Sequence, residues 1–342
     1  MTQALKPIRE FPGPEDFPTL GALVESGQPA VLRGLVSQWP VTREARISPA
    51  ATVAYLQRFE SGALVDAVMT QPEIAGRLFY NDSMSGFNFI RNRLTLSAVA
   101  EQVLRYSTFP RAPAVAAQSA LIAECLPGFG AENRLALLDE SIQPRIWLGT
   151  AMTTPTHLDE WNNIGCVVAG RRRFTLFPPE QITNLYIGPI DFAPTGAPMS
   201  LVRLDRPDFA RFPLFRAALE SAVTAELGPG DAIFLPPLWW HHVESLESFN
   251  LLVNYWWHAD GGDSTRGNSG FDSMVHAILN LRQLPPATRA AWGALFAHYV
   301  FGPGVGVTDH IPLERHGLLG QLGPEAVARA RAFLAGRLQP KG

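Results

Sequence analysis

The chain has 342 residues, of which 46% are hydrophobic and 17% are charged, and its formal net charge is −3. That length and apolar content support a sizeable core in one large domain or two smaller ones. The slightly acidic balance gives no electrostatic reason to expect a nucleic acid as partner. Neither a membrane span nor a signal peptide is visible, and Cys125 and Cys166 show no CxxC spacing, so we expect a cytoplasmic protein without disulfides.

The first 142 residues predict a mixed region of helices and short strands that packs on a barrel. Residues 29–35 form a buried apolar run that ends in a glycine turn. Apolar residues at helical spacing predict helices over 49–59 and 96–106, the second with Ser97 as its N-cap. The Ala- and Leu-rich stretch 111–140 also predicts helix in parts.

Residues 143–260 change in character and predict the core of the protein. Short apolar runs alternate there with Gly and Pro, at 145–149, 164–168, 173–177, 231–235 and 250–257. Closely spaced short strands are typical of an antiparallel sandwich or barrel and not of βαβ units. Residues 178–226 interrupt the pattern as a long, partly irregular insertion, which favours a lid or a substrate-contacting loop.

The last part of the chain, 261–342, is predicted to be helical. A Gly- and Ser-rich segment over 261–270 has the composition of a linker. Three helices are expected after it, over 274–283, 287–300 and 324–338.

His157 and Asp159 form a His-x-Asp pair whose side chains would share one face if the segment is a strand, because successive strand residues alternate in direction. A further histidine is available about eighty residues later, at His241 or His242. Two histidines and one carboxylate are the ligands of the facial triad that holds non-haem Fe(II) and leaves open coordination positions. An isolated His-x-Asp is most often an ordinary polar pair, so the flanking sequence has to carry the interpretation.

Four ordered blocks flank these residues: 157–163, 170–179, 230–244 and 254–257. Together they resemble the JmjC/cupin-like oxygenase family, and most closely its branch containing the asparaginyl hydroxylase that acts on hypoxia-inducible factor. The resemblance spans roughly residues 145–258. It implies a mainly β fold with flanking helices, a double-stranded β-helix of the jelly-roll or cupin type, followed by a C-terminal helical segment.

The resemblance also implies the metal and its ligands. It assigns His157, Asp159 and His241 to Fe(II), with 2-oxoglutarate as cosubstrate and dioxygen as the oxidant. Both the Trp-Trp-His-His block of the family and strand alternation favour His241 over His242. His242 would then lie on the opposite face as a supporting or packing residue, with Glu244 as one candidate hydrogen-bond partner.

For the cosubstrate, the family places a basic residue fifteen positions after the first ligand, and that residue here is Arg172 where near relatives carry lysine. Arg172 would pair with the distal carboxylate of 2-oxoglutarate. The alternative is that the run 171–173 is merely a solvated turn, although alternation places Arg172 on one face with Phe174. The remaining family positions that bind cosubstrate or iron-bound water, or wall the site, are matched by Thr154, Asn163, Asn254 and Trp256.

These observations lead to an expected function and assembly. We expect an Fe(II)- and 2-oxoglutarate-dependent oxygenase that hydroxylates a protein or peptide side chain and releases succinate and CO2. The alternatives are a small-molecule hydroxylase of the same mechanism, a cupin-type metal enzyme that does not use 2-oxoglutarate, and a non-catalytic metal-binding cupin module. Because relatives pair through C-terminal helices, residues 261–342 are expected to form a homodimer.

Overall fold

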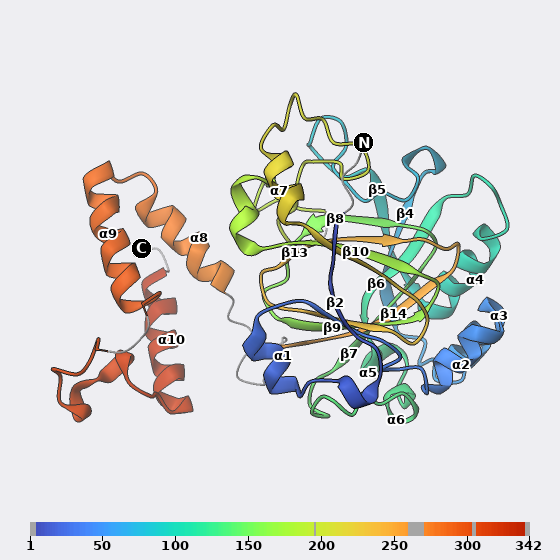
Figure 1. Ribbon diagram of the computed structural model, residues 1–342, viewed down its shortest axis with the longest axis horizontal. Coiled ribbons are helices and arrows are strands. Elements are labelled where there is room, and N and C mark those ends of the chain that lie inside the picture. The colour runs from blue at the N-terminus through green and yellow to red at the C-terminus, as the bar shows by residue number, and fades with distance from the viewer. Residues whose placement is uncertain (1–4, 195, 259–269, 303–305, 339–342) are drawn as a thin grey trace. The chain divides into compact units, whose positions relative to one another are not determined.

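The computed structural model describes residues 5–194, 196–258, 270–302 and 306–338. The chain divides into two compact units, residues 1–267 and 268–342. The first unit consists of two β-sheets with helices around them, and the second is helical (Figure 1). The predicted linker 261–270 lies outside the described residues except for Gly270, where a helix begins.

Two sheets packed face to face make up the first unit. Within the described residues the smaller sheet has the strand order β1-β11-β10-β13-β8, and the larger has the order β2-β3-β12-β9-β14-β7-β6-β4-β5. The strands are β1 (Lys6–Pro7), β2 (Arg9–Phe11), β3 (Ala30–Leu32), β4 (Leu64–Thr70), β5 (Phe89–Thr95), β6 (Ala114–Leu121), β7 (Pro144–Gly149), β8 (Thr153–His157), β9 (Asn162–Ala169), β10 (Arg172–Phe177), β11 (Val223–Leu227), β12 (Ala232–Leu235), β13 (Trp240–Ser245) and β14 (Asn250–Trp257). Apart from the parallel pairs β1–β11 and β2–β3, the strand pairings described are antiparallel. The expected mainly β, jelly-roll-type fold is confirmed, and strands from the first 142 residues belong to both sheets.

Helices cover the outer face of the larger sheet. Among the described residues of both units, the α-helices are α1 (Leu20–Ser26), α2 (Pro40–Ile47), α3 (Pro49–Gln57), α4 (Leu96–Tyr106), α5 (Ile122–Cys125), α6 (Phe129–Glu132), α7 (Phe215–Ser221), α8 (Gly270–Leu281), α9 (Pro286–Tyr299) and α10 (Pro324–Leu338). Of these, α2, α3 and α4 form the outer layer on the larger sheet. The outer layer buries Val41, Val53 and Val99 from α2, α3 and α4 against Ile146 and Leu251 of the sheet. Figure 1 shows these helices along one side of the unit.

The central strands of the larger sheet are buried on both faces. Cys166 of β9 points to the helix side, where it is fully buried, and its neighbour Val167 points to the space between the sheets. There Val167 meets Phe174 and Leu176 of β10. Strands buried on two sides have near-continuous apolar sequences, which is why 164–168 and 250–257 could be predicted as strands without an alternating pattern.

The helical prediction over 111–140 is wrong in its first third. Residues 114–121 form β6, which lies between β4 and β7 in the larger sheet. Alanine is a good helix former in isolation, but a small residue is required here because the backbone of β7 passes close by at Gly149. Only the short helices α5 and α6 follow in the rest of the stretch.

Gly149 is the position where this close approach is tightest. A Cβ at Gly149 would lie 2.5 Å from the Cβ of Ala116 and 2.9 Å from the carbonyl oxygen of Val115. We expect Gly149→Ala to lower the free energy of unfolding by about 1–3 kcal/mol, the usual cost of overpacking a core. Gly165→Ala in β9 is the matched control, since its Cβ would meet ordinary contacts at 3.6 Å. Urea unfolding of both variants checks this, and equal stabilities would contradict it.

The predicted cap of α4 is displaced by two residues. Thr95, not Ser97, is the N-cap, and its hydroxyl accepts a hydrogen bond from the backbone N–H of Ala98. The backbone N–H of Ser97 instead donates to the carboxylate of Glu60, 3.0 Å away. Either hydroxyl residue could cap locally, and the end of β5 at Thr95 decides which one does.

The segment 178–226 is only partly the irregular insertion that was expected. It contains the 3-10 helix Pro179–Thr183 and α7, and it ends in β11, which pairs with β10 and is an integral strand of the smaller sheet. Its middle returns to the barrel, where Met199 bridges to His157. The loop near Pro194 reaches the mouth of the cavity described below.

The second unit consists of α8, α9 and α10, close to the predicted ranges. None of the described residues in these three helices is buried. Among the described residues, no helix combines the length and the apolar character that crossing a bilayer requires.

Candidate metal centre

One cavity opens between the two sheets, at the end where β8, β9, β13 and β14 meet. Its volume is about 230 Å³. The smaller sheet contributes His157, Arg172 and His241 to its wall, and the larger sheet contributes Asn163 and Asn254. Polar side chains from strands far apart in the sequence therefore converge on one cavity.

His157, Asp159 and His241 lie together in this cavity. The metal-binding atoms that they offer all lie within 4.8 Å of one another. His157 and His241 are directly opposite in the β8–β13 pair, and their ring centroids are 4.2 Å apart. The Nε2 atom of His241 is 3.6 Å from Oδ2 of Asp159.

The alternation argument assumed that His157 and Asp159 lie on one strand, and this assumption is wrong. β8 ends at His157, and Asp159 lies in the turn that follows. The backbone carbonyl of Asp159 accepts a hydrogen bond of 2.8 Å from the N–H of Leu238, and this contact ties the turn to the segment that precedes His241. The carboxylate of Asp159 therefore meets the histidines from the segment between β8 and β9.

Both histidine rings are oriented by the backbone two residues before them. Nδ1 of His157 lies 2.9 Å from the carbonyl oxygen of Pro155, and Nδ1 of His241 lies 3.0 Å from that of Trp239. A carbonyl only accepts, so each Nδ1 carries the proton and each Nε2 keeps a free lone pair. Burial, together with the charge of neighbouring His241, lowers the pKa of His157 to about 4, which keeps its imidazole neutral at physiological pH.

His242 is buried on the other side of β13 and does not line the cavity. The strand pairing shifts between His241 and Val243, yet the two histidines still point to opposite faces. Glu244 is not the partner of His242 that the sequence indicated: it pairs with Arg173, and Nδ1 of His242 has no hydrogen-bond partner among the described residues.

Acid should destabilise the metal-free protein through His157 and His242, whose pKa values are lowered in the folded state. Burial, helped by the charge of Arg77, lowers the pKa of His242 to about 3. Below pH 6.5 the unfolded chain therefore takes up a proton that the folded chain refuses. The contribution of each neutral histidine to the free energy of unfolding is fully present above pH 6.5. It is lost as the pH falls, by about 2 kcal/mol per histidine at pH 5. Urea unfolding at pH 7, 6 and 5 gives the free energy of unfolding as a function of pH. Its slope should be smaller by about 1 kcal/mol per pH unit in His242→Asn than in the wild type, and an unchanged slope would refute this.

Two donors converge on the carboxylate of Asp159. Nδ2 of Asn163 lies 3.1 Å from its Oδ2, and Nε1 of Trp256 lies 3.2 Å from the same atom. Asn254 in turn donates to Asn163 at 3.2 Å. Thr154, the remaining predicted cosubstrate residue, also lines the cavity. The structure thus brings these sequence-predicted residues to one place, with the amide of Asn163 and the indole of Trp256 bonded to Asp159 and the amide of Asn254 bonded to Asn163.

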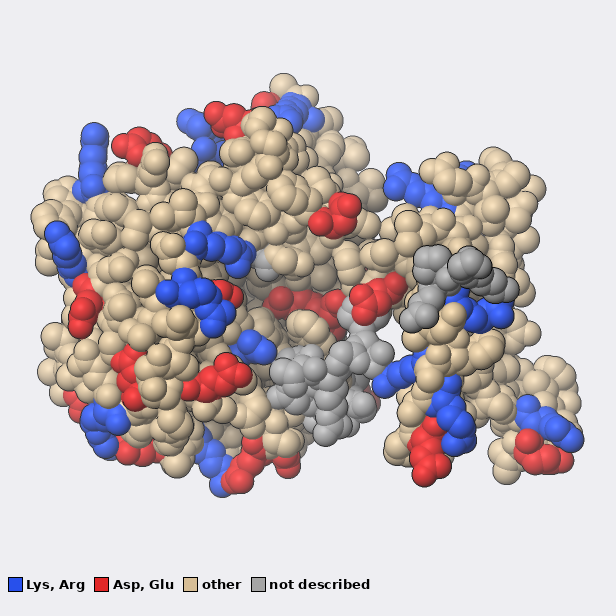
Figure 2. Space-filling model, turned by 180° about the vertical axis from the view of Figure 1, so that it is seen from behind, with Lys and Arg blue, Asp and Glu red and all other residues tan. Residues whose placement is uncertain are grey.

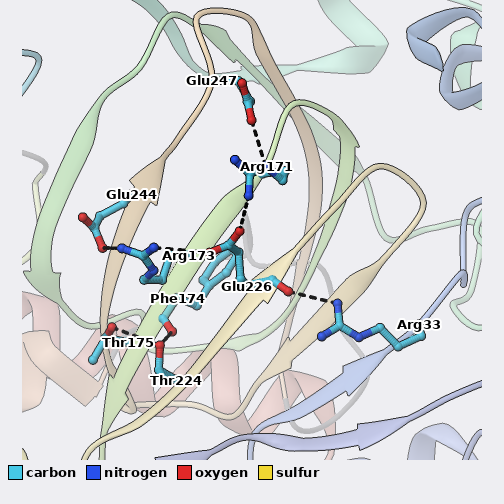
Figure 3. Close-up of polar contacts among 9 residues, drawn as sticks. All are labelled: Arg33, Arg171, Arg173, Phe174, Thr175, Thr224, Glu226, Glu244 and Glu247. Atoms are coloured by element: carbon cyan, nitrogen blue, oxygen red, sulfur yellow. Dashed lines mark hydrogen bonds and ion pairs between the residues drawn. The ribbon is translucent and has the colours of Figure 1, made fainter. Parts of the chain in front are cut away.

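Arg172 differs from its neighbours in the run 171–173. Arg171 and Arg173 project to the outer surface of the smaller sheet, where Glu226 lies between them and Glu247 and Glu244 complete an ion-pair network (Figure 3). Arg172 faces the opposite way, into the cavity. The solvated-turn interpretation therefore holds for its two neighbours only.

The guanidinium of Arg172 lacks a partner in the described part of the chain. Its Nε is fully enclosed without a hydrogen bond, and burial lowers its pKa to about 10, so it is still charged at neutral pH. Uncompensated buried charge is costly, and such a group is suited to a ligand that brings an opposite charge.

The donor set fits a non-haem iron centre with a dicarboxylate beside it. Two neutral imidazole nitrogens and one carboxylate, on one side of a cavity, are suited to Fe(II) and leave other positions open. The unpaired guanidinium of Arg172 supplies the charge that a carboxylate of a second ligand requires.

Sequence reasoning missed Trp147, which lines the cavity and bonds to a residue of the site. Its Nε1 donates to Oδ1 of Asn254 at 2.8 Å, and it lies opposite Leu252 on the face of β7 that looks between the sheets. A tryptophan on the inner face of a predicted strand was the available signal, but which polar group its indole meets depends on how β7 pairs with β14.

Comparisons with known proteins agree with this architecture. HSPB1-associated protein 1 of Homo sapiens is 35% identical over 147 residues, which are 42% of this chain and 30% of that protein. JmjC domain-containing protein F of Dictyostelium discoideum is 35% identical over 130 residues, 34% of this chain and 27% of that protein. Lysine-specific demethylase JMJ31 of Arabidopsis thaliana is 32% identical over 115 residues, 33% of this chain and 20% of that protein. Each match spans less than a third of the relative.

A family profile covers more of the chain than these pairwise matches do. The profile of the cupin-like domain matches residues 17–263, and so includes every residue of the candidate metal centre and the strands of both sheets from β3 to β14. With relatives named for their JmjC domains and a His-Asp-His cluster in the cavity between its sheets, this chain belongs to the cupin-like domain family.

Proposed function

We propose that the protein is an Fe(II)- and 2-oxoglutarate-dependent oxygenase. The observation that carries the proposal is the presence, in one cavity, of a His157–Asp159–His241 cluster and the unpaired cation of Arg172. A cluster alone would fit many metal enzymes. A buried cation beside it fits a cosubstrate with a free carboxylate, which is what 2-oxoglutarate offers.

The metal would be held by Nε2 of His157, Nε2 of His241 and the carboxylate of Asp159. Fe(II) held there would, with 2-oxoglutarate and dioxygen, supply the oxidising chemistry: one oxygen atom of dioxygen would enter the substrate as a hydroxyl and the other would enter succinate, with release of CO2. The protein contributes position. Pro155 and Trp239 fix the imidazole rings through their carbonyl groups, so that no ring has to turn when the metal binds.

The cosubstrate would lie between Arg172 and the metal. Arg172 would pair with its distal carboxylate, and the hydroxyl of Thr154 and the amides of Asn163 and Asn254 offer hydrogen bonds along the way. Trp256 forms part of the cavity wall. The larger, planar head of arginine replaces the usual lysine, and its fork can bind a carboxylate through two N–H groups.

We further propose a protein or peptide side chain as the substrate. The cavity of about 230 Å³ is smaller than the roughly 300–1,000 Å³ typical of small-molecule sites. It adjoins a second cavity of about 310 Å³, with Asp66, Gln118 and Ser119 in the walls of both. One side chain of an extended polypeptide could enter the first cavity while its neighbours occupy the second.

Charge and similarity support the same choice. Basic and acidic side chains are interspersed on the face seen in Figure 2, without the broad positive area that a nucleic-acid backbone favours. The names of two relatives refer to HSPB1 and to lysine demethylation, both of which point to protein targets. The resemblance of the 157–163 and 230–244 blocks to the asparaginyl hydroxylase branch favours hydroxylation over demethylation.

The second unit is proposed to form a homodimer. Phe301, Leu318 and Phe333 are 77%, 75% and 65% exposed, and no described residue of α8, α9 or α10 is buried. Exposed apolar area of this kind marks an interaction surface, and a second copy would cover it. Light scattering should give twice the chain mass for the wild type and the single mass for Phe333→Asp, whereas a monomeric wild type would contradict the proposal.

The two buried, free cysteines support a reducing, cytoplasmic location.

The test of the proposed function is turnover of the cosubstrate. Iron-loaded protein should convert 2-oxoglutarate to succinate in the presence of dioxygen, and peptide libraries should stimulate the reaction with a mass gain of one oxygen atom on a side chain. Stimulation by small molecules alone would favour the small-molecule hydroxylase. Protein that binds metal yet neither binds nor consumes 2-oxoglutarate would leave only the non-catalytic module or a cosubstrate-independent enzyme.

A further inference from the structure

A chain of hydrogen bonds crosses the larger sheet and ends on the candidate metal ligand Asp159. Trp147 donates from Nε1 to Oδ1 of Asn254 at 2.8 Å, and Asn254 donates from Nδ2 to Oδ1 of Asn163 at 3.2 Å. Asn163 then donates from Nδ2 to Oδ2 of Asp159 at 3.1 Å. Both asparagines are buried, with exposed fractions of 6% for Asn163 and 2% for Asn254.

The two ends of this chain fix its direction. An indole N–H can only donate, and a carboxylate can only accept. Each amide between them therefore has one permitted orientation, because a flipped Asn254 would place its Nδ2 against the indole N–H of Trp147. A flipped Asn163 would likewise turn its oxygen toward the carboxylate of Asp159. The polarity thus follows from the chemistry of Trp147 and Asp159.

Strand pairing explains why these side chains meet. Trp147 of β7 is directly opposite Leu252 of β14, so it is the diagonal neighbour of Asn254 two residues further along. On the other side of β14, Trp256 is directly opposite Asn163 of β9. All of these positions belong to the face of the sheet that looks into the cavity.

We propose that Trp147 is a positioning residue of the metal centre, which acts through Asn254 and Asn163 to fix the carboxylate of Asp159. This inference rests on the proposed function, because it concerns the residues that would hold the metal. Nδ2 of Asn163, at the end of the hydrogen-bond chain, and Nε1 of Trp256 both donate to Oδ2 of Asp159, and no described residue donates to its Oδ1. The carboxylate is thereby held in one rotamer with lone pairs left for a cation.

The hydrogen-bond chain also determines which donors the cavity wall offers to a ligand. Each asparagine amide has two N–H groups and uses one of them within the chain. The orientation imposed by Trp147 thus presents the second N–H of Asn163 and of Asn254 as a spare donor among the lining residues. Donors in this position are suited to a ligand rich in carboxylate oxygens.

Trp147→Phe tests the inference, since it removes the N–H and keeps an aromatic ring. Loss of an outer hydrogen-bond partner typically weakens metal binding by about 10- to 100-fold. We expect a loss of that size for Co(II) measured by calorimetry without turnover, with a change in the visible absorption of the bound Co(II). Trp161→Phe is the matched control: Trp161 also packs on the ring of Trp256, but its indole bonds to no described residue, and Co(II) affinity should stay within about twofold.

A double-mutant cycle separates positioning from packing. If Trp147 acts through Asn254, Trp147→Phe should have no further effect on Co(II) affinity in an Asn254→Leu background. Additive losses would assign the effect to packing and overturn the inference, as would Trp147→Phe that binds Co(II) as tightly as the wild type. If Trp147→Phe does not fold, a normal Co(II) affinity in Asn254→Leu would also overturn it. Wild-type protein that binds neither Co(II) nor Fe(II) would contradict the proposed function itself, which keeps the two failures distinct.

Discussion

Alanine at His241 is expected to abolish metal binding and 2-oxoglutarate turnover, whereas alanine at the adjacent His242 should leave both in place. The two residues are neighbours in the sequence and both are buried, but only His241 lies with His157 and Asp159. A catalytic metal contributes several kcal/mol to transition-state stabilisation, and losing it corresponds to a decrease of about 1000-fold or more in rate.

The comparison is informative because each variant controls for the other. His242→Ala removes a similar buried ring and is expected to change stability, but not the stoichiometry of bound iron. Metal content measured by mass spectrometry, and succinate release measured in the same preparations, should fall together in His241→Ala. Retention of stoichiometric iron in His241→Ala, with loss in His242→Ala, would reverse the ligand assignment.

Replacement of Arg172 by Gln should weaken 2-oxoglutarate binding by about 30-fold or more, since truncation of one partner of a buried, hydrogen-bonded charge pair costs about 2–5 kcal/mol. Arg172→Lys keeps the charge and should recover most of the affinity. Arg173→Gln is the matched control, because Arg173 pairs with Glu226 and Glu244 on the outer surface. Calorimetric titration with 2-oxoglutarate in the presence of Mn(II) measures all three.

The same substitution should have the opposite effect on the ligand-free fold. Arg172 has no partner among the described residues, and burial opposes its charge. Arg172→Gln removes that unfavourable charge, so its midpoint of thermal unfolding without ligand should exceed that of the wild type. A site residue that stabilises the ligand complex at the expense of the empty fold is a sign of a binding function. Unchanged 2-oxoglutarate affinity in Arg172→Gln would remove the basis for the cosubstrate assignment.

The parts of the fold that could be predicted are those encoded in short stretches. β14 has the predicted bounds because Asn250–Trp257 is mostly apolar and almost wholly buried, and helices α3 and α4 follow their apolar spacing. β6 could not be predicted in this way. Its alanines favour a helix locally, and they form a strand because β4 and β7 lie on either side.

The site shows the same division between local and distant information. His157, Asp159 and His241 could be proposed from motif and spacing, and alternation was enough to separate Arg172 from its neighbours. The link from Trp147 to Asp159 could not be foreseen, since it depends on the pairing of β7, β14 and β9 across more than a hundred residues of sequence. Strand pairing of this kind is a tertiary property, which a short motif does not contain.

The ion pairs on the outer surface of β10 also favour the correct register between β10 and its neighbouring strands. Arg173 is directly opposite Glu226 on one side and Glu244 on the other, while Leu176 is opposite His241. A slip of one residue between β10 and β13 would reverse which side chains of one of the two strands face inward, and would bring either His242 or a neighbour of Arg172 into the cavity. Each surface pair alone stabilises little, but the misaligned pairing would break the ion pair between Arg173 and Glu244 that joins β10 to β13. Charges that lie far from the chemistry can therefore ensure that the chain folds with the correct histidine and the correct arginine inside.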